Sequence, residues 1–575
     1  ATDYTAISQA ALIALGDEDS PSDLALQLDY RIRHILVDEF QDTASPQLEL
    51  LRKLTNGWQA GDGRTLFIVG DGMQSGYGFR NANVGLFLDA RQQGIGSVAL
   101  EALDLRVNFR SQAGVVNWVN NIFQHAFPAQ DDISRGAVSY SPSVAFKPEL
   151  DKELHGDAMQ FHICNYLSPD KSSQDKSFEK YDDDDDENIS RHSNPRQDAQ
   201  WQEAEQVVAL VQQARFKNPD GTIAILVRTR THLQKILPVL SAAGLNYQAT
   251  EIDRLASRMA IMDLLSLTRA LLNPADRIAW LAILRAPWCG LDNHDLHRIS
   301  TAPLNELNPR ANDTAFGVIW PQLQHHTNIS GISNAGQQIL ARVVPLLQQT
   351  LATRYRKPLR QWIEGIWLAL GGPATLLDEN DQDNIQSFFA LLDKHQQGGS
   401  IGDWQAFHQA IERLFAAPRA DADARLQVMT IHKSKGLEFD TVIIPGLDRS
   451  ERKDDKQLLL WQERITHQGE KQLLLGSLAP TGKEEDGLYT FMRREQEKQQ
   501  AFESTRLLYV GCTRAIKQLH LIACINSKEE ELQAPAKNSL LHSIWPLVKE
   551  QANIITGRNA PVIETAVPLN IDRHG

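Results

Sequence analysis

Short apolar runs that end in acidic segments recur along this chain. Residues 34–37 lead directly into Asp38 and Glu39, and residues 66–69 are followed closely by Asp71. Such runs are typical of central strands in a parallel sheet, and ligands in open α/β folds gather at the carboxyl ends of these strands. The pattern predicts two buried parallel strands that deliver polar groups to one edge. For an isolated acidic pair, a solvated strand end remains the simpler interpretation.

The remaining periodicity predicts an α/β protein with a helical insertion. Between about residues 257 and 417, strand patterns are scarce and the apolar spacing is helical. The charged stretch 451–486 is predicted to be irregular and exposed. Helices are predicted at 3 to about 28, 45–54, 115–123, 203–214, 233–243, 262–272 and 279–284, and further strands at 222–228, 441–444 and 519–525.

Composition and targeting patterns predict the number of domains and the cellular compartment. The 575 residues are 42% hydrophobic and 23% charged, which is enough apolar material for three or four domains. No run reaches the ~20 apolar residues of a membrane span, and no signal pattern opens the chain, so we expect a cytoplasmic protein without membrane contact. The cysteines form no C-x-x-C pair and are expected to be reduced and structural: Cys164, Cys289, Cys512 and Cys524.

The net charge of −14 does not exclude a nucleic-acid partner, because phosphate binding depends on local basic clusters. Part of the excess lies in the acidic tract 182–187, within a polar stretch of about 168–200. We predict a disordered surface loop there. An acidic mimic of DNA is the alternative.

The six residues 38–43, DEFQDT, resemble the Walker B segment, motif II, of superfamily 1 DNA helicases of the UvrD/RecB type. The resemblance implies RecA-like P-loop NTPase domains with parallel sheets, and ATP and Mg²⁺ as cofactors. It makes Asp38 the Mg²⁺ ligand and Glu39 the base that positions and deprotonates the attacking water. This division suits phosphoryl transfer, in which a protein mainly positions groups and offsets charge.

The glycine-rich loop 72–82 resembles motif III of the same helicases. By that resemblance, Gln74 senses the γ-phosphate, and Tyr77, Phe79 and Arg80 contact DNA. Stacking of a base on an aromatic ring contributes roughly 1–3 kcal/mol whatever the base, which suits a motor that moves along any sequence. Without this context, both aromatic residues would be assigned to the core.

Residues 108–111, NFRS, resemble motif IV, which makes Phe109 a surface for adenine and Arg110 an arginine finger on the γ-phosphate. Residues 503–515 resemble motif VI, whose arginine here is Arg514, a second γ-phosphate contact. A guanidinium suits this role because its planar fork grips two phosphate oxygens. For Arg514 alone, a salt bridge on a helix surface is the alternative.

Residues 428–439 resemble motif V. The resemblance implies that Glu438 contacts the nucleotide and that His432, Lys433 and Lys435 lie at the DNA backbone. Basic and small residues in this segment also suit phosphate binding on chemical grounds. A buried histidine with satisfied hydrogen bonds is the alternative for His432.

The sequence contains no G-x-x-x-x-G-K-[ST] phosphate loop, although this motor needs one. Family order places that loop upstream of Ala1, so we expect a truncated chain, and no nuclease core is identifiable after Arg514. The expected domains are a partial first RecA-like domain (1–103), a second RecA-like domain in two parts (104–258 and 419–575), and an all-helical 2B-type insertion (259–418).

The resemblance as a whole implies an ATP-dependent DNA helicase or translocase of repair or recombination. It is most like the motor of a RecB- or AddA-type nuclease-helicase, moving 3′ to 5′. Its partners would be single-stranded DNA, duplex at the junction, and partner subunits. The alternative is a helicase-like module that binds DNA or another protein without catalysis. The missing phosphate loop favours the alternative, whereas the motif residues favour the motor.

Overall fold

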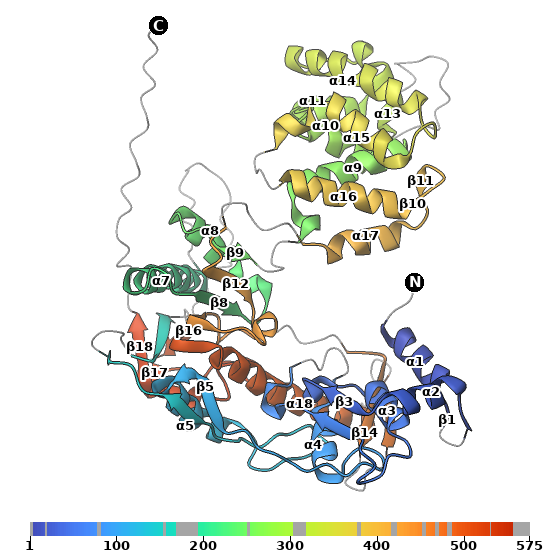
Figure 1. The fold of residues 1–575 in the computed structure, drawn as a ribbon. Helices are drawn as coiled ribbons and strands as arrows, with labels where there is room; N and C mark the ends of the chain where they lie inside the picture. Colours follow the sequence, from blue (N-terminus) through green and yellow to red (C-terminus); the bar gives the residue numbers. More distant parts are fainter. Residues whose placement is uncertain are drawn as a thin grey trace. The chain divides into compact units, whose positions relative to one another are not determined.

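The computed structural model describes residues 4–17, 20–76, 82–152, 157–167, 194–249, 254–302, 318–376, 381–415, 422–450, 456–465, 471–479, 486–528 and 531–555. They form two compact units (Figure 1). Unit 1 consists of residues 1–245 and 425–575, and unit 2 of residues 246–424. Unit 2 contains the whole of the predicted insertion, 259–418.

Unit 1 begins with a small first lobe. Its strands β3 and β4 are parallel, with His34 opposite Thr65 and Val37 opposite Ile68. Its elements are α1 (Tyr4–Leu15), β1 (Gly16–Asp17), β2 (Ser20–Pro21), α2 (Asp23–Arg31), β3 (His34–Val37), η1 (Phe40–Asp42), α3 (Ser45–Leu54), β4 (Thr65–Ile68), η2 (Gly72–Gln74) and α4 (Val84–Gln93).

Two predictions for the first lobe were wrong in detail. The helix expected from residue 3 to about 28 is two helices, because Gly16 adopts a φ of +77° and the Ser22 hydroxyl then caps α2 by accepting the N–H of Ala25. Strands β3 and β4 are parallel as predicted, but neither is buried. Side chains alternate along both, so Ile35 packs on the lobe's core while Leu36 of β3 is 77% exposed and Phe67 of β4 is 49% exposed.

The second lobe of unit 1 is built on a larger parallel sheet with the strand order β18-β7-β16-β13-β8-β12. Its elements are β5 (Val107–Gln112), α5 (Ala113–Ala126), β6 (Val144–Lys147), β7 (Met159–Tyr166), α7 (Pro195–Lys217), β8 (Ile223–Val227), η5 (Arg230–Leu233), α8 (Ile236–Ala242), β12 (Leu426–Thr430), η10 (Ile431–Ser434), β13 (Phe439–Ile444), β14 (Leu459–Ile465), β15 (Lys471–Ser477), α18 (Gly487–Cys512), β16 (Ala515–Lys528), β17 (Glu531–Leu532), α19 (Trp545–Val548), η11 (Lys549–Gln551) and β18 (Ala552–Ile555).

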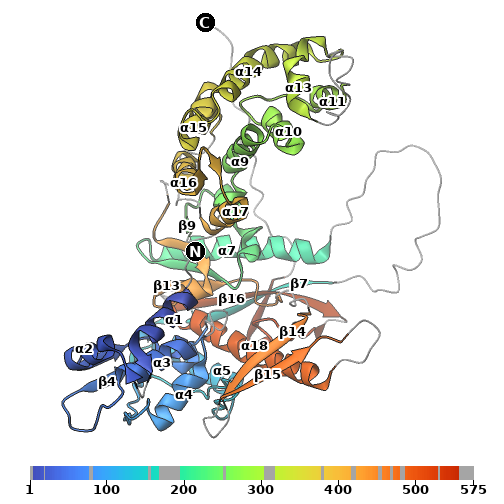
Figure 2. The ribbon, with the colours of Figure 1, turned by 90° about the vertical axis from the view of Figure 1, so that its right-hand side faces the viewer.

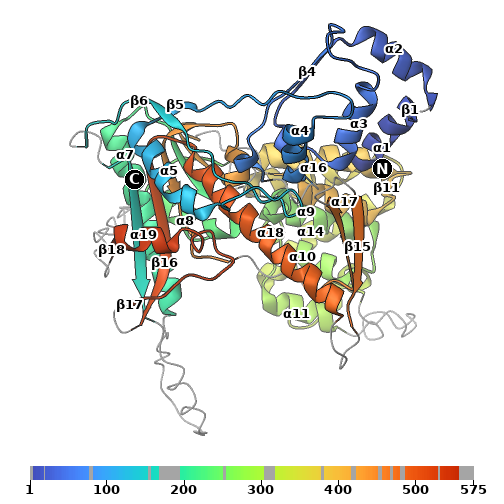
Figure 3. The same ribbon diagram turned by 90° about the horizontal axis from the view of Figure 1, so that it is seen from below.

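Apolar sequence explains this sheet. All five residues of β8 are buried, as the unbroken apolar run predicted. The lobe's core also takes in Met73, Val84 and Leu88 from the first lobe. Helix α18 contacts η2 of the first lobe and η10 of the second, and it crosses this unit in Figure 3. The two lobes therefore share one packed interface.

Two further predictions concern charged stretches. The segment 451–486 is not wholly irregular, because β14 and β15 form an antiparallel hairpin that contacts α18 (Figure 2). Leu460 of this hairpin is buried, whereas Trp461 is 60% exposed. The loop predicted at about 168–200 ends earlier, since α7 begins at Pro195. Its acidic tract, 182–187, lies outside the described residues.

Unit 2 is helical, apart from short strands. In its core the buried Trp280 ring stacks on the partly buried Trp320 ring, with the ring centroids 5.1 Å apart. Its elements are β9 (Gln248–Ala249), η6 (Leu255–Ser257), α9 (Met259–Leu272), α10 (Arg277–Arg285), α11 (Asn293–Thr301), α13 (Ile319–Gln324), η8 (His326–Asn328), α14 (Asn334–Ala352), α15 (Leu359–Ala369), η9 (Gly372–Thr375), α16 (Asp381–His395), β10 (Gln396–Gln397), β11 (Ser400–Ile401) and α17 (Trp404–Arg413).

None of the helices in the described part of the chain is long and apolar enough to cross a membrane. The four cysteines, all of them described, are buried and free of disulfide bonds, as predicted.

Candidate functional site

The acidic tip of strand β3 forms one side of the candidate site. Asp38 follows the strand directly, and its Oδ1 accepts the N–H of Glu39 at 2.8 Å. Glu39 has a φ of +54°, a left-handed conformation that is uncommon for residues other than glycine and that often occurs at functional sites. Both residues are exposed. The turn therefore presents two carboxylates to solvent at the strand's carboxyl end.

A chain of side-chain amides links this tip to the next loop. The Gln41 amide donates to Glu39 Oε2, and its Oε1 accepts the N–H of Asp71 at 2.9 Å. The Asp71 carboxylate in turn accepts the Gln74 amide at 2.8 Å. Burial raises the pKa of Asp71, although its hydrogen bonds oppose the shift. No pattern in the sequence predicted a role for Asp71 or Gln41.

Arg514 reaches this network from the second lobe. Its Nη2 donates to Gln74 Oε1 at 3.0 Å, and its Nε donates to the carbonyl of Val510 at 3.0 Å. The side chain is almost fully buried, and burial together with nearby Arg110 lowers its pKa to about 10. The guanidinium therefore stays charged at neutral pH. The salt bridge on a helix surface, the alternative for Arg514, does not describe this buried side chain.

Arg110 lies beside Arg514 in the second lobe. The Asn108 side chain accepts the Arg110 N–H at 2.9 Å and so shapes the end of β5. Arg110 Nε donates to Glu438 at 2.8 Å, and its Nη1 donates to the carbonyl of Thr513 at 3.3 Å. The predicted phosphate and nucleotide contacts of motifs IV, V and VI thus meet where strands β13 and β16 begin.

Phe109, the predicted adenine surface, is 63% exposed. Its ring lies 4.9 Å from that of Phe146, which is 67% exposed. Two exposed aromatic rings next to Arg110 provide an apolar surface on which a flat base can stack. No pattern in the sequence pointed to Phe146.

Lys435 lies on the carboxylates of the first lobe. Its Nζ is 2.9 Å from Glu39 Oε2 and also contacts the Asp42 carboxylate. Although burial acts the other way, these carboxylates raise the pKa of Lys435. The resemblance assigned Lys435 to the DNA backbone. In the structure its ammonium contacts Glu39, the predicted catalytic base.

The remaining predicted DNA contacts are only partly described. Tyr77, Phe79 and Arg80 lie outside the described residues. Lys433 is exposed on η10, and the His432 ring lies beside Gly76 of the motif III loop. This position brings motif V next to motif III.

Arg506 is a further bridge that the sequence analysis missed. Its Nε donates to the carbonyl of Ser75 at 2.9 Å, and its Nη1 donates to the carbonyl of Gly136 at 2.8 Å. Burial lowers its pKa to about 10. Its place inside the motif VI segment was the only signal in the sequence, and that signal does not distinguish it from a surface arginine.

The donor atoms at the strand tip fit a magnesium ion. Asp38 and Glu39 offer exposed carboxylate oxygens, the hard ligands that Mg²⁺ prefers, and Mg²⁺ usually takes only one or two of them besides water and phosphate oxygens.

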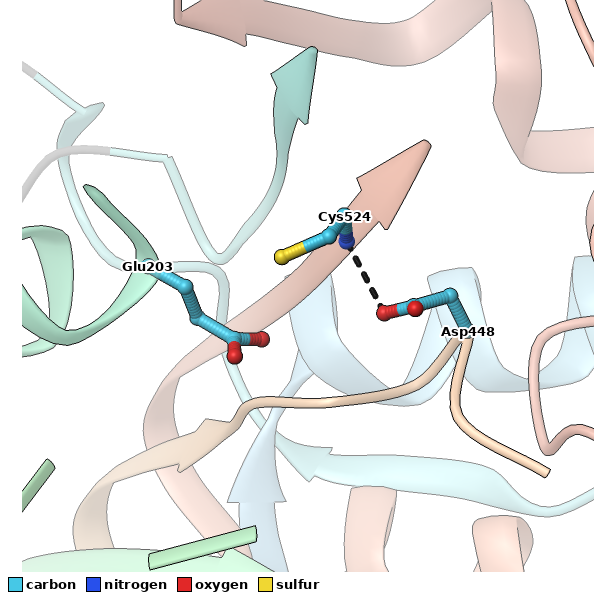
Figure 4. Close-up of side chains that lie close together, drawn as sticks. All are labelled: Glu203, Asp448 and Cys524. Carbon is cyan, nitrogen blue, oxygen red and sulfur yellow. Dashed lines mark hydrogen bonds between the residues drawn. The ribbon is translucent and has the colours of Figure 1, made fainter. Parts of the chain in front are cut away.

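Among the described residues, another group could also hold a metal. Glu203, Asp448 and Cys524 each place one ligand atom within 4.8 Å of the others (Figure 4). However, the Glu203 carboxylate already accepts the Gly446 N–H at 2.6 Å and pairs with Arg449. The largely buried Arg449 guanidinium already offsets the negative charge there, so we assign no metal to this group.

Comparison with known proteins identifies the family. The UvrD-like helicase C-terminal domain matches residues 103–526, and the UvrD/REP helicase N-terminal domain matches residues 2–94. The chain is 26% identical over 570 residues to an ATP-dependent helicase/nuclease subunit of Exiguobacterium sibiricum, covering 92% of this chain and 43% of that protein.

Two other relatives have similar names and match a similar share of the chain. An ATP-dependent helicase/nuclease subunit of Leuconostoc mesenteroides is 27% identical over 581 residues, which cover 94% of this chain and 42% of the relative. The exonuclease/helicase subunit RexA of Lactococcus lactis is 26% identical over 570 residues, covering 92% and 43%. The chain thus spans less than half the length of these relatives. The predicted resemblance and the α/β fold class are confirmed, and the chain belongs to the UvrD-like helicase family.

Proposed function

We propose that this chain forms the ATP-hydrolysing and DNA-translocating part of a helicase that acts in DNA repair or recombination, with 3′ to 5′ movement. The observation that carries the proposal is the bridged site. Gln74 and Glu39 of one lobe are joined to Arg514 and Lys435 of the other. ATP bound between lobes can drive their closure, which is how such motors convert hydrolysis into movement.

In the proposed reaction, Glu39 accepts a proton from water while the water oxygen bonds to the γ-phosphorus. The bond from phosphorus to the bridging oxygen breaks, and ADP leaves. Arg110 and Arg514 offset the charge on the transferred phosphoryl group. Asp38 would hold Mg²⁺, which neutralises phosphate charge when bound.

DNA would bind next to this site. Lys433 and His432 on η10 are the described candidates for phosphate contact, with Tyr77, Phe79 and Arg80 as further candidates by resemblance. The relatives' names describe subunits of helicase/nuclease enzymes, so we also propose that this chain works with a partner protein.

The test is phosphate release from ATP, with and without single-stranded DNA. It is run on this chain and on the same chain extended at its N-terminus through a phosphate loop. We expect DNA-stimulated turnover in the extended chain, and Glu39→Gln should lower it by about 10²–10⁴-fold while ATP and DNA still bind. The control is Glu49→Gln, which removes a carboxylate of a surface pair on α3. Turnover in neither chain, with DNA binding retained, would favour the non-catalytic module.

A further inference from the structure

Lys435 belongs to the bridged site, but the reaction proposed above gives its ammonium no role. Its ammonium contacts two carboxylates of the first lobe, Glu39 and Asp42. The Lys435 side chain is only 10% exposed, and that of Asp42 only 16%. An ammonium so far removed from water needs charged partners, and these two carboxylates supply them.

Exposure separates the two lysines of this segment. Lys433 is exposed and can meet an extended polyanion, whereas Lys435 points into the lobe interface. A DNA backbone follows a surface, so a largely buried ammonium is poorly placed to neutralise it. The same ammonium is well placed to fix a carboxylate on the facing lobe.

Two donors hold the Glu39 carboxylate. Lys435 and the Gln41 amide both donate to Oε2, and no other described residue donates a hydrogen bond to Oε1, the oxygen that can meet a water molecule. Asp42 contacts the same ammonium and so restricts where it can lie. These contacts fix the orientation of the Glu39 side chain, although that side chain remains 54% exposed.

We propose that Lys435 is the positioning residue for Glu39, holding the catalytic carboxylate from the opposite lobe so that it meets the attacking water only when the lobes are together. This inference rests on the proposed function and deepens it. It couples base positioning to lobe closure, because the holding group and the base belong to different lobes.

The test compares the ATP turnover of Lys435→Met with that of wild type in the extended chain at saturating single-stranded DNA. Since a misplaced catalytic group can lower a rate about 10²-fold, we expect kcat to fall by about that factor while the KM for ATP stays unchanged. Lys435→Arg should recover part of the loss. In a Glu39→Gln background, Lys435→Met should have no further effect on kcat.

Controls separate this role from others. Lys498 also lies 2.9 Å from a glutamate, Glu495, but outside the site, so Lys498→Met should leave kcat unchanged. Single-stranded DNA affinity, measured by fluorescence anisotropy, should be nearly the same for Lys435→Met and wild type. A loss of DNA affinity with kcat retained at saturating DNA would return Lys435 to the DNA backbone and overturn the inference alone. Absence of turnover in wild type would overturn the proposed function together with the inference.

Discussion

Two glutamates of unit 1 make the same kind of ion pair in opposite surroundings. Glu39 pairs with Lys435 and is 54% exposed, whereas Glu203 pairs with Arg449 and is completely buried. Burial alone would raise the pKa of Glu39, but the hydrogen bonds from Lys435 and Gln41 lower it below its ordinary value. At Glu203 burial outweighs Arg449 and raises the pKa to about 7.

The difference teaches how to separate a working carboxylate from a structural one. Both pairs join residues far apart in the sequence, so a large sequence separation alone does not indicate function. The Glu203 cluster is closed, since Gly446 and Arg449 occupy its oxygens and Asp448 accepts the Cys524 N–H at 2.9 Å (Figure 4). Glu39 keeps an open face toward solvent, where a substrate can reach it.

The largest effect on stability should follow from removing the buried partner. Glu203→Ala leaves the largely buried Arg449 guanidinium without its carboxylate and the Gly446 N–H without its acceptor. We expect unit 1 to lose about 3–5 kcal/mol of unfolding free energy in urea. Glu205→Ala, at an exposed position on the same helix, is the control. An equal loss of unfolding free energy in Glu203→Ala and Glu205→Ala would show that the contacts of Glu203 do not contribute specifically to stability.

The pH dependence of stability should be the next largest effect. Because the pKa of Glu203 is raised in the folded state from 4.5 to about 7, its contribution to stability is complete below about pH 4.5 and is lost as the pH rises through 7. We expect about 1–3 kcal/mol less stability at pH 8 than at pH 5 from this group. The charged and titratable groups that interact with it include Arg449, Asp448, Lys235 and Cys524.

Glu203→Gln tests this sign, because an amide keeps the shape of the carboxylate without titrating. Urea unfolding at both pH values should show a smaller difference than in wild type. Some slope should remain, since burial also raises the pKa of Asp448. A slope that is unchanged in the variant would mean that Glu203 titrates normally.

Sequence patterns predicted where strands end, but they did not predict the ion pairs between distant segments. The run before Asp38 and the run 222–228 were visible because a strand is a local pattern, and β8 indeed occupies Ile223–Val227. The motif resemblance also predicted that Gln74 and Arg514 both contact the γ-phosphate, and in the structure a hydrogen bond joins the two side chains.

The pairing of Glu203 with Arg449 spans 246 residues and leaves no local signal. On α7, Glu203 resembles its exposed neighbour Glu205, and only the packing of the helix on the sheet decides which one is buried. The same holds for Lys435, which the sequence could not distinguish from Lys433. Tertiary packing decides which charges are removed from water, and single-sequence periodicity does not report it.

The smallest effect should come from Glu39, and it completes the comparison. Since the Glu39 side chain is more than half exposed and the Asp42 carboxylate remains beside Lys435, Glu39→Gln should change the urea unfolding free energy of unit 1 by less than about 1 kcal/mol. The amide keeps the backbone turn and can still accept the Gln41 N–H. The same substitution is expected to lower ATP turnover by about 10²–10⁴-fold, whereas Glu203→Gln should leave the turnover of folded molecules unchanged. If Glu39→Gln destabilised unit 1 as strongly as Glu203→Ala, then Glu39 would be a structural carboxylate like Glu203, and its exposed face would be no sign of catalysis.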